Sequence, residues 1–192
     1  MADKSIDPQV AKTAMMSVME AALAKMSGIV STEQPQVVEK EVIEYENRLR
    51  VTGMEKFNAP SFISVINFYL SQADMDRHKG AKGAMIFYVD SENSGKLFKA
   101  LGFPTNDDED DISMMNSCGE VCNVVGKGFK DELVKAGYVD LFMSPAHNYK
   151  NSILEGVEFS TDQTTMHEFC FFYWKRKSIV VELTLAAVPM KR

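Results

Sequence analysis

The stretch ISMMNSCGEVCNVVGKGFKDELVKA, residues 112–136, decides how this chain folds. When its residues are placed at about 100° intervals around a helix axis, the apolar side chains gather on one arc. That arc holds Met114, Met115, Cys118, Val121, Cys122, Val125, Phe129 and Leu133. Because an amphipathic helix buries its apolar face, the stretch predicts a long helix that packs on a sheet and ends at Gly137.

The opposite arc of this helix is polar. It holds Ser113, Asn116, Glu120, Asn123, Lys127, Lys130 and Asp131. Glu120 and Asn123 are about 60° apart in its middle, so both point towards whatever docks there. The spacing alone is not specific, since Glu44 and Asn47 repeat it. Without further context, such a pair is an ordinary solvated surface.

Three glycines, Gly119, Gly126 and Gly128, interrupt the same helix. Each is less favourable than Ala in a helix interior by about 1 kcal/mol. Their presence predicts that another part of the protein, or a partner, approaches this backbone closely. Close packing against the first helix of the chain and contact with a docking partner both remain open.

A second long helix is predicted near the N-terminus. Asp7 can cap it and Pro8 suits its first turn, and the helix runs to about residue 26, closed by Gly28. Its apolar stripe consists of Val10, Ala11, Ala14, Met15, Val18, Met19, Ala22, Leu23 and Met26. This face is expected to cover a sheet.

The remaining pattern predicts strands. Residues 62–70 and 83–89 are rich in Ile, Val, Phe and Tyr and are expected to form an antiparallel hairpin. Asp90 and Ser91 are expected to cap a short helix through residue 101. Further strands are expected at residues 138–144, 158–159, 166–174 and 179–187, with a tight turn at 175–177. The expected fold is α/β of the α+β type: an antiparallel, roughly six-stranded sheet with two long helices packed on one face.

Length and composition narrow the class of protein. The 192 residues are expected to form a single domain, in which residues 29–56 stay unassigned. The chain has no secretory signal and no run of roughly 20 apolar residues, which predicts a cytoplasmic protein without membrane insertion. A net charge of −6 disfavours nucleic acid as a partner, because phosphate binding needs a basic surface.

No pattern of metal ligands stands out. Cys118, Cys122 and Cys170 lack the paired spacing of a zinc site, so reduced core cysteines are expected. Of the three histidines, His78, His147 and His167, only the last lies near a cysteine in sequence. The acidic residues 107–111 lack the Gly and distal Glu of a calcium loop, and are expected to stabilise a helix N-terminus.

The run GEVCNVVGKG, residues 119–128, together with Phe129, Lys130, Leu133 and the downstream pair Ser144-Pro145, supplies context for Glu120 and Asn123. It resembles the signature of the CheX and CheC chemotaxis phosphatases of the CheC/CheX/FliY superfamily: a helical Glu-x-x-Asn, a following Gly, and a downstream strand bearing Pro. The resemblance covers roughly residues 57–188.

The resemblance implies a phosphatase that acts on a phosphorylated CheY-like response regulator, which carries an aspartyl phosphate. Glu120 is then expected to engage the active-site lysine of the regulator, and Asn123 to orient the attacking water. Asn116, Lys127 and Pro145 are expected to contribute to docking. The phosphatase needs no cofactor of its own, since the regulator supplies the Mg²⁺.

Two departures from the family pattern bear on these expectations. The family often has Asp or Ser four residues before the Glu, where this chain has Asn116. The CheC type carries a second Glu-x-x-Asn on its first long helix, where this chain has Glu20 and Leu23. A single Glu-x-x-Asn site favours the CheX type, and that resemblance implies a homodimer. An open sheet edge at residues 166–174 would also favour a homodimer.

Two other classes of function stay open. The first is a non-catalytic module, similar to flagellar switch proteins, that binds the phosphorylated regulator without turnover. The second is a small-molecule-binding α/β sandwich, which no specific feature of the sequence favours.

Overall fold

The computed structural model describes residues 8–27, 32–41, 44–45, 48–49, 54–103, 110–151 and 165–191. In chain order the elements are α1 (Pro8–Ser27), β1 (Gln36–Glu41), β2 (Glu44–Tyr45), β3 (Arg48–Leu49), α2 (Met54–Phe57), β4 (Ser61–Tyr69), α3 (Gln72–Asp76), β5 (Gly83–Asp90), α4 (Ser94–Ala100), α5 (Asp111–Lys135), β6 (Phe142–Met143), β7 (His147–Lys150), β8 (Thr165–Tyr173) and β9 (Arg176–Leu185).

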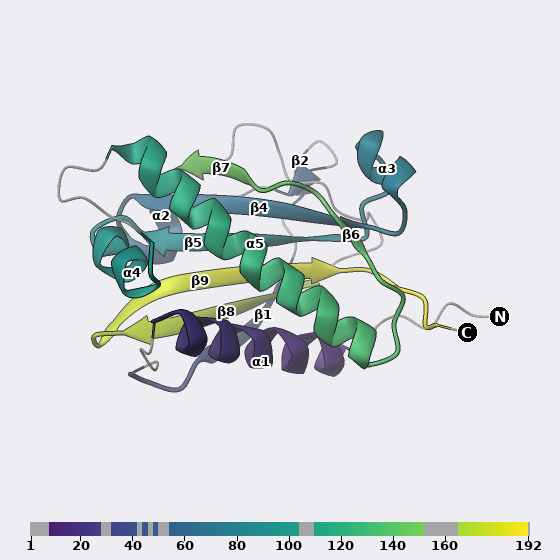
Figure 1. The fold of residues 1–192 in the computed structure, drawn as a ribbon, viewed down its shortest axis with the longest axis horizontal. Helices are drawn as coiled ribbons and strands as arrows, with labels where there is room; N and C mark the ends of the chain where they lie inside the picture. The colour runs from purple at the N-terminus through teal and green to yellow at the C-terminus, as the bar shows by residue number, and fades with distance from the viewer. Residues whose placement is uncertain are drawn as a thin grey trace.

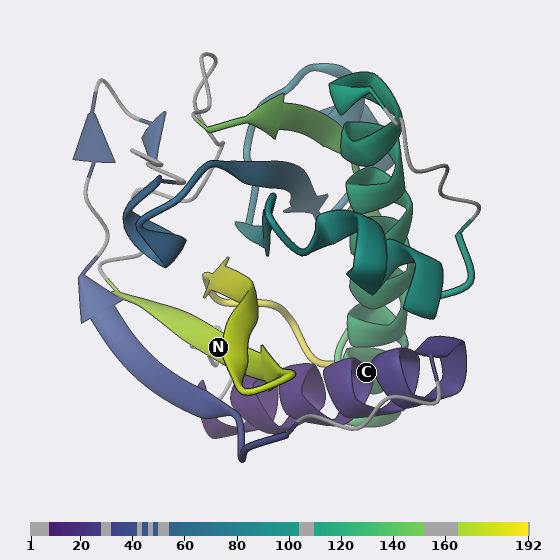
Figure 2. The same ribbon diagram turned by 90° about the vertical axis from the view of Figure 1, so that its left-hand side faces the viewer.

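The sheet is antiparallel and seven-stranded, in the order β1-β8-β9-β5-β4-β6. The strand β7 also pairs with β4, along the first half of β4, whereas β6 pairs with its last two residues. Helices α1 and α5 lie on one face of this sheet, and α5 crosses it obliquely (Figure 1). In Figure 2, α5 runs vertically on the right and α1 runs along the bottom, and the small β2-β3 hairpin lies at the upper left, on the side away from α5. The predicted fold class is therefore confirmed.

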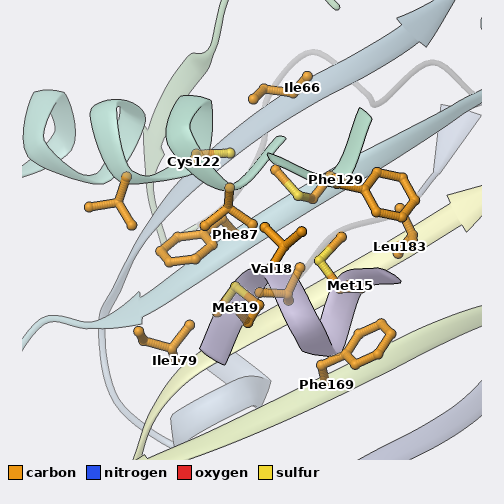
Figure 3. Close-up of a cluster of buried hydrophobic side chains, with 14 of the residues drawn as sticks. Met15, Val18, Met19, Ile66, Phe87, Cys122, Phe129, Phe169, Ile179 and Leu183 are labelled. Carbon is orange, nitrogen blue, oxygen red and sulfur yellow. The ribbon is translucent and has the colours of Figure 1, made fainter. Parts of the chain in front are cut away.

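The main core lies between the two long helices and the sheet. Figure 3 shows Met15, Val18 and Met19 of α1 facing Cys122 and Phe129 of α5, with strand residues beneath them. The labelled strand residues are Ile66, Phe87, Phe169, Ile179 and Leu183. Fully burying an apolar side chain of this size stabilises the fold by about 1.5–3 kcal/mol, so this cluster holds α5 firmly on the sheet.

Both long helices match their predictions closely. Pro8 is the first residue of α1, and α5 begins one residue before the predicted stretch. The side chain of Asp110 caps α5 by accepting a hydrogen bond from the Ser113 N–H at 2.9 Å. Hydrogen bonding to Ser113 lowers the pKa of the Asp110 carboxyl. Residues 107–109 of the acidic segment lie outside the described residues.

The sheet differs from prediction at its two edges. Residues 36–41, in the unassigned region, form β1 and pair with β8. Residues 166–174 are therefore not an open edge, and that argument for a homodimer was wrong. At the other edge, His147–Lys150 form a strand that was not predicted, because its sequence is polar. The predicted strand at 158–159 lies outside the described residues.

Three local boundaries also differ. The predicted strand at 138–144 shrinks to β6, since Tyr138 makes only an isolated bridge to Met190. The short helix begins at Ser94, because Asp90 ends β5 and accepts a hydrogen bond from the Glu92 N–H instead of capping a helix. The turn between β8 and β9 lies at residues 174–175, both with positive φ, which suits a two-residue hairpin.

No helix in the described part of the chain is long and apolar enough to cross a membrane.

Candidate functional site

Helix α5 divides into the two faces that its sequence predicts. Six of the eight apolar residues are buried and two are half-buried; the half-buried ones are Met114 and Met115. On the other face Asn116, Glu120 and Lys127 are exposed, and Asn123 is half-buried. Successive spacings of four, three and four residues place these side chains in one stripe along the helix.

Glu120 and Asn123 are not committed to other groups. Within the part of the chain that the structure describes, neither side chain forms a hydrogen bond or an ion pair. Further along the same helix, by contrast, Lys130 pairs with Asp140 at 3.3 Å. A carboxylate and a carboxamide without internal partners are free to bond to a docked molecule.

The three glycines of α5 have three separate neighbours. A Cβ on Gly128 would lie 2.8 Å from Cγ1 of Val18, so α1 packs closely against α5 at this glycine. Packing on the first helix was one of the two alternatives that the sequence left open. A Cβ on Gly126 would lie 2.8 Å from Sδ of Met143, on β6. A Cβ on Gly119 would lie 2.6 Å from Oδ1 of Asn148 on β7. Packing on the first helix therefore explains one glycine, and packing on the sheet edge explains the other two.

These contacts set the position of Pro145. Met143 touches α5 at Gly126 and Asn148 touches it at Gly119, so the segment between them runs antiparallel to the helix. Pro145 is exposed and lies in the connection between β6 and β7, not within a strand as expected. Its level along α5 is that of the residues between the two glycines, which include Glu120 and Asn123.

The residue before Pro145 holds this connection to the sheet. The Ser144 N–H donates to the backbone oxygen of Asn67 at 3.0 Å, and the Asn67 N–H donates to Ser144 Oγ at 3.0 Å. The Ser144 hydroxyl in turn donates to the Pro145 backbone oxygen at 3.0 Å. Pro145 is thus presented beside α5 by a well-bonded segment.

Strand β7 is joined to the first turn of α5 by an ion pair between Lys150 and Asp111. Both side chains are more than one third exposed, so the pair adds little to stability by itself. The ammonium of Lys150 also lies 6.0 Å from the ring centroid of Phe62.

Two residues near the site were missed by sequence reasoning. Asn148 lies against α5 at Gly119, and its Oδ1 accepts a hydrogen bond from the hydroxyl of the buried Ser64 on β4. The two residues are opposite each other in the β4-β7 register. The only signal in the sequence was Gly119 itself, which predicted a close neighbour without saying which.

The cysteines are buried and free of disulfides, as predicted. Burial raises the pKa of the Cys118 and Cys122 thiols above their ordinary range, so both stay protonated and serve as apolar side chains. Among the described residues, no group of three or more His, Cys, Asp or Glu side chains is placed to hold a metal ion. That the chain carries no catalytic metal of its own stays a prediction.

In sequence, the chain matches no family model and no curated protein. Its structure is similar to the chemotaxis protein CheX from Desulfovibrio desulfuricans, with 16% identity, a TM-score of 0.54, and coverage of 92% of this chain and 99% of that one. It is also similar to CheX in a complex with CheY, BeF3 and Mg²⁺ from Borrelia burgdorferi, with 15% identity, a TM-score of 0.53, and coverage of 93% and 97%.

A third similar structure is FliY from Thermotoga maritima, with 14% identity, a TM-score of 0.54, and coverage of 96% of this chain and 93% of that one. Each likeness extends over almost the whole of both chains. The antiparallel sheet with two long helices on one face is therefore the fold of these CheX and FliY structures.

Proposed function

We propose that this protein hydrolyses the aspartyl phosphate of a CheY-like response regulator, through the face of α5 that carries Glu120 and Asn123. The observation that carries the proposal is the pair itself. On a helix packed tightly to the sheet, a carboxylate and a carboxamide lie one helical turn apart, with no bonding partner among the described residues. Sites built on rigid elements hold reacting groups more accurately than sites on loops.

Hydrolysis of the aspartyl phosphate requires few groups from the phosphatase. A water oxygen forms a bond to phosphorus while the bond from phosphorus to the aspartyl oxygen breaks, which leaves a free carboxylate and inorganic phosphate. The regulator already contributes the phosphoryl group and the Mg²⁺ that balances its charge. What the phosphatase must add is a water held in line with the breaking bond.

Asn123 is the residue proposed to hold that water. A carboxamide can accept a hydrogen bond through its oxygen and donate through its nitrogen, so it can fix both position and orientation of a water molecule. Its half-buried place on α5 limits the freedom of the side chain. Holding a reactant in this way can lower the barrier by several kcal/mol.

Glu120 is proposed to engage the active-site lysine of the regulator. The carboxylate is exposed, and an ion pair across an interface steers association and sets the docking register. Asn116 and Lys127 extend the docking surface along the helix, and Pro145 borders it. Function as a dimer and residence in the cytoplasm belong to the same proposal.

The rival function is a module that binds the phosphorylated regulator without turnover. The observation that favours it is that proteins other than CheX share the fold. The structure of this chain is also similar to FliM in a complex with SpeE from H. pylori, with a TM-score of 0.54 at 9% identity. A module that only binds has no use for an uncommitted carboxamide at position 123.

Phosphate release distinguishes the two functions. The protein is mixed with a phosphorylated CheY-like regulator, and inorganic phosphate is followed with time while association is measured in parallel. A phosphatase accelerates release above the rate of the regulator alone, and the acceleration saturates with protein concentration. Association without any acceleration supports the binding module instead.

A further inference from the structure

Asn148 occupies the space that a side chain at position 119 would fill. A Cβ on Gly119 would lie 2.6 Å from Oδ1, 2.7 Å from Nδ2 and 3.0 Å from Cγ of Asn148. Because Oδ1 and Nδ2 are almost equally near and Cγ is farther away, the end of the carboxamide points at this position, with its oxygen and nitrogen side by side. A strand residue thus adds a polar group to α5, at the turn that leads into Glu120 and Asn123.

Ser64 holds this carboxamide in one orientation. The Ser64 side chain is fully buried, and its hydroxyl donates to Asn148 Oδ1. The amide oxygen is therefore engaged from the side of the sheet. In the described part of the chain, the Nδ2 donors of Asn148 have no acceptor, and the residue is only half-buried. The result is an oriented N–H donor next to the surface of the site.

This donor and the Asn123 side chain lie at the same part of α5. Residue 123 follows Gly119 by one helical turn, so its side chain starts roughly 5–6 Å from the Cβ position of residue 119. Nδ2 of Asn148 lies 2.7 Å from that same position. In the described part of the chain Asn123 and Asn148 make no hydrogen bond to each other, and neighbouring polar groups without a direct bond can be bridged by water.

We infer that Asn148 is a second water-positioning residue of the site, which holds the attacking water together with Asn123; this inference rests on the proposed function. Asn148 Nδ2 donates to one lone pair of the water oxygen, and the water donates one proton to Asn123 Oδ1. The second lone pair of the water is left to attack phosphorus. A second contact from a separate element restricts the direction of that lone pair more tightly than Asn123 does by itself.

The test uses variants that remove the donor in different ways. Asn148→Asp keeps the shape of the side chain and the acceptor for Ser64, but replaces the NH₂ donor with an oxygen. Gly119→Ala adds no charge and keeps the Asn148 amide, but the new Cβ displaces that amide from its position. Asn148→Ala removes the group. His147→Ala is the matched control, since His147 is exposed and its side chain points to the other face of the sheet by strand alternation.

Turnover is measured at saturating phosphorylated regulator, with KM and association determined separately. Each of the three site variants is expected to lower kcat about tenfold or more and to change KM by about twofold or less. This is the pattern expected when one hydrogen bond that forms in the transition state is lost. His147→Ala is expected to keep the wild-type kcat. Wild-type kcat in either Asn148→Asp or Gly119→Ala overturns the inference, because both lack a positioned donor.

The outcomes also separate this inference from the proposed function. If the proposed function fails, the wild-type protein releases no phosphate, or Asn123→Ala has full activity. If only the role of Asn148 fails, Asn123→Ala remains impaired while Asn148→Asp or Gly119→Ala hydrolyses at the wild-type rate.

Discussion

Gly126 lets α5 lie close against the sheet beneath the proposed site. A Cβ there would lie 2.8 Å from Met143 Sδ, 3.1 Å from Ile66 Cδ1 and 3.2 Å from Met85 Cε. We predict that Gly126→Ala destabilises the protein by about 1 kcal/mol, because overpacking costs about 1–3 kcal/mol and the gain in helix propensity offsets about 1 kcal/mol of that cost. Urea denaturation measures this change.

Gly95 in α4 is the matched control for that substitution. A Cβ at Gly95 would meet only Met114 Cε, at an ordinary contact distance of 3.4 Å. Gly95→Ala is therefore expected to leave the free energy of unfolding unchanged or to raise it by about 0.5 kcal/mol. Gly126→Ala with wild-type stability would contradict the tight packing of α5 on β6 and β4.

The exposed Glu120 side chain allows a prediction about docking. Glu120→Ala is expected to weaken association with the phosphorylated regulator several-fold, because an interfacial charge mainly sets the rate of encounter. Stability should change by less than about 0.5 kcal/mol, since the side chain is exposed. A binding titration at low and high salt measures the effect, which should shrink as salt screens the charges.

Glu44→Ala is the control for Glu120→Ala, since Glu44 shares the Glu-x-x-Asn spacing but lies on β2. The Glu44→Ala variant should bind the regulator with the same affinity as the wild-type protein. An equal loss of affinity in both variants would point to overall charge, and not to the face of α5, as the source of binding.

Among the elements, α2 and β1 are held to the sheet by a buried charge cluster on the face away from α5. Glu168 of β8 and Glu182 of β9 are cross-strand neighbours. Lys56 of α2 bonds to both carboxylates, and Lys40 of β1 bonds to Glu168 at 2.6 Å. The Tyr88 hydroxyl donates to Glu182 at 2.5 Å. The cluster thus ties segments distant in sequence to the two central strands.

This cluster makes stability depend on pH. Burial opposes the charge of Glu168, but hydrogen bonds from Lys40 and Lys56 outweigh it and lower the pKa of the carboxyl. A lowered pKa in the folded state contributes stability that is present above the ordinary glutamate pKa of about 4.3 and is lost as pH falls through the folded value. Its contribution is therefore complete at neutral pH and disappears in acid.

We predict that Glu168→Gln lowers the free energy of unfolding by roughly 2 kcal/mol at pH 7, because it leaves Lys40 and Lys56 without a full counter-charge. As pH falls from about 4.3 through the lower pKa of the folded state, the difference between the wild-type protein and the variant should shrink, because protonation removes the same charge from the wild type. Urea denaturation across this range measures the difference. A difference that stays constant down to pH 3 would show that the charge of Glu168 is not responsible.

The elements also show how far sequence reasoning reaches. Helices α1 and α5 and the β4-β5 hairpin were predictable, because their apolar periodicity is local and strong. Strands β1 and β7 were not, since QVVEKE and HNYK carry polar side chains and owe their structure to pairing with β8 and β4. Asn148 was missed for the same reason, whereas the faces of α5, and with them Glu120 and Asn123, followed from helix geometry.

For the whole molecule, self-association remains a prediction. Among the described residues, the sheet ends in β1 at one edge and in β6 and β7 at the other. On β1, Val38 is 46% exposed, and an edge with free backbone groups and an exposed apolar residue favours pairing with another chain. We expect light scattering at about 10 µM to give twice the mass of one chain. A single-chain mass at every concentration up to about 100 µM would contradict a homodimer.

The central claim is that Asn123 turns a docking surface into a hydrolytic site. Phosphate release from a phosphorylated CheY-like regulator, compared at saturation between the wild-type protein and Asn123→Ala, tests it most directly. The account predicts that the wild type accelerates release and that Asn123→Ala lowers kcat by roughly 10² or more while association is largely kept. Full hydrolysis by Asn123→Ala, or no acceleration by the wild type despite association, would contradict it.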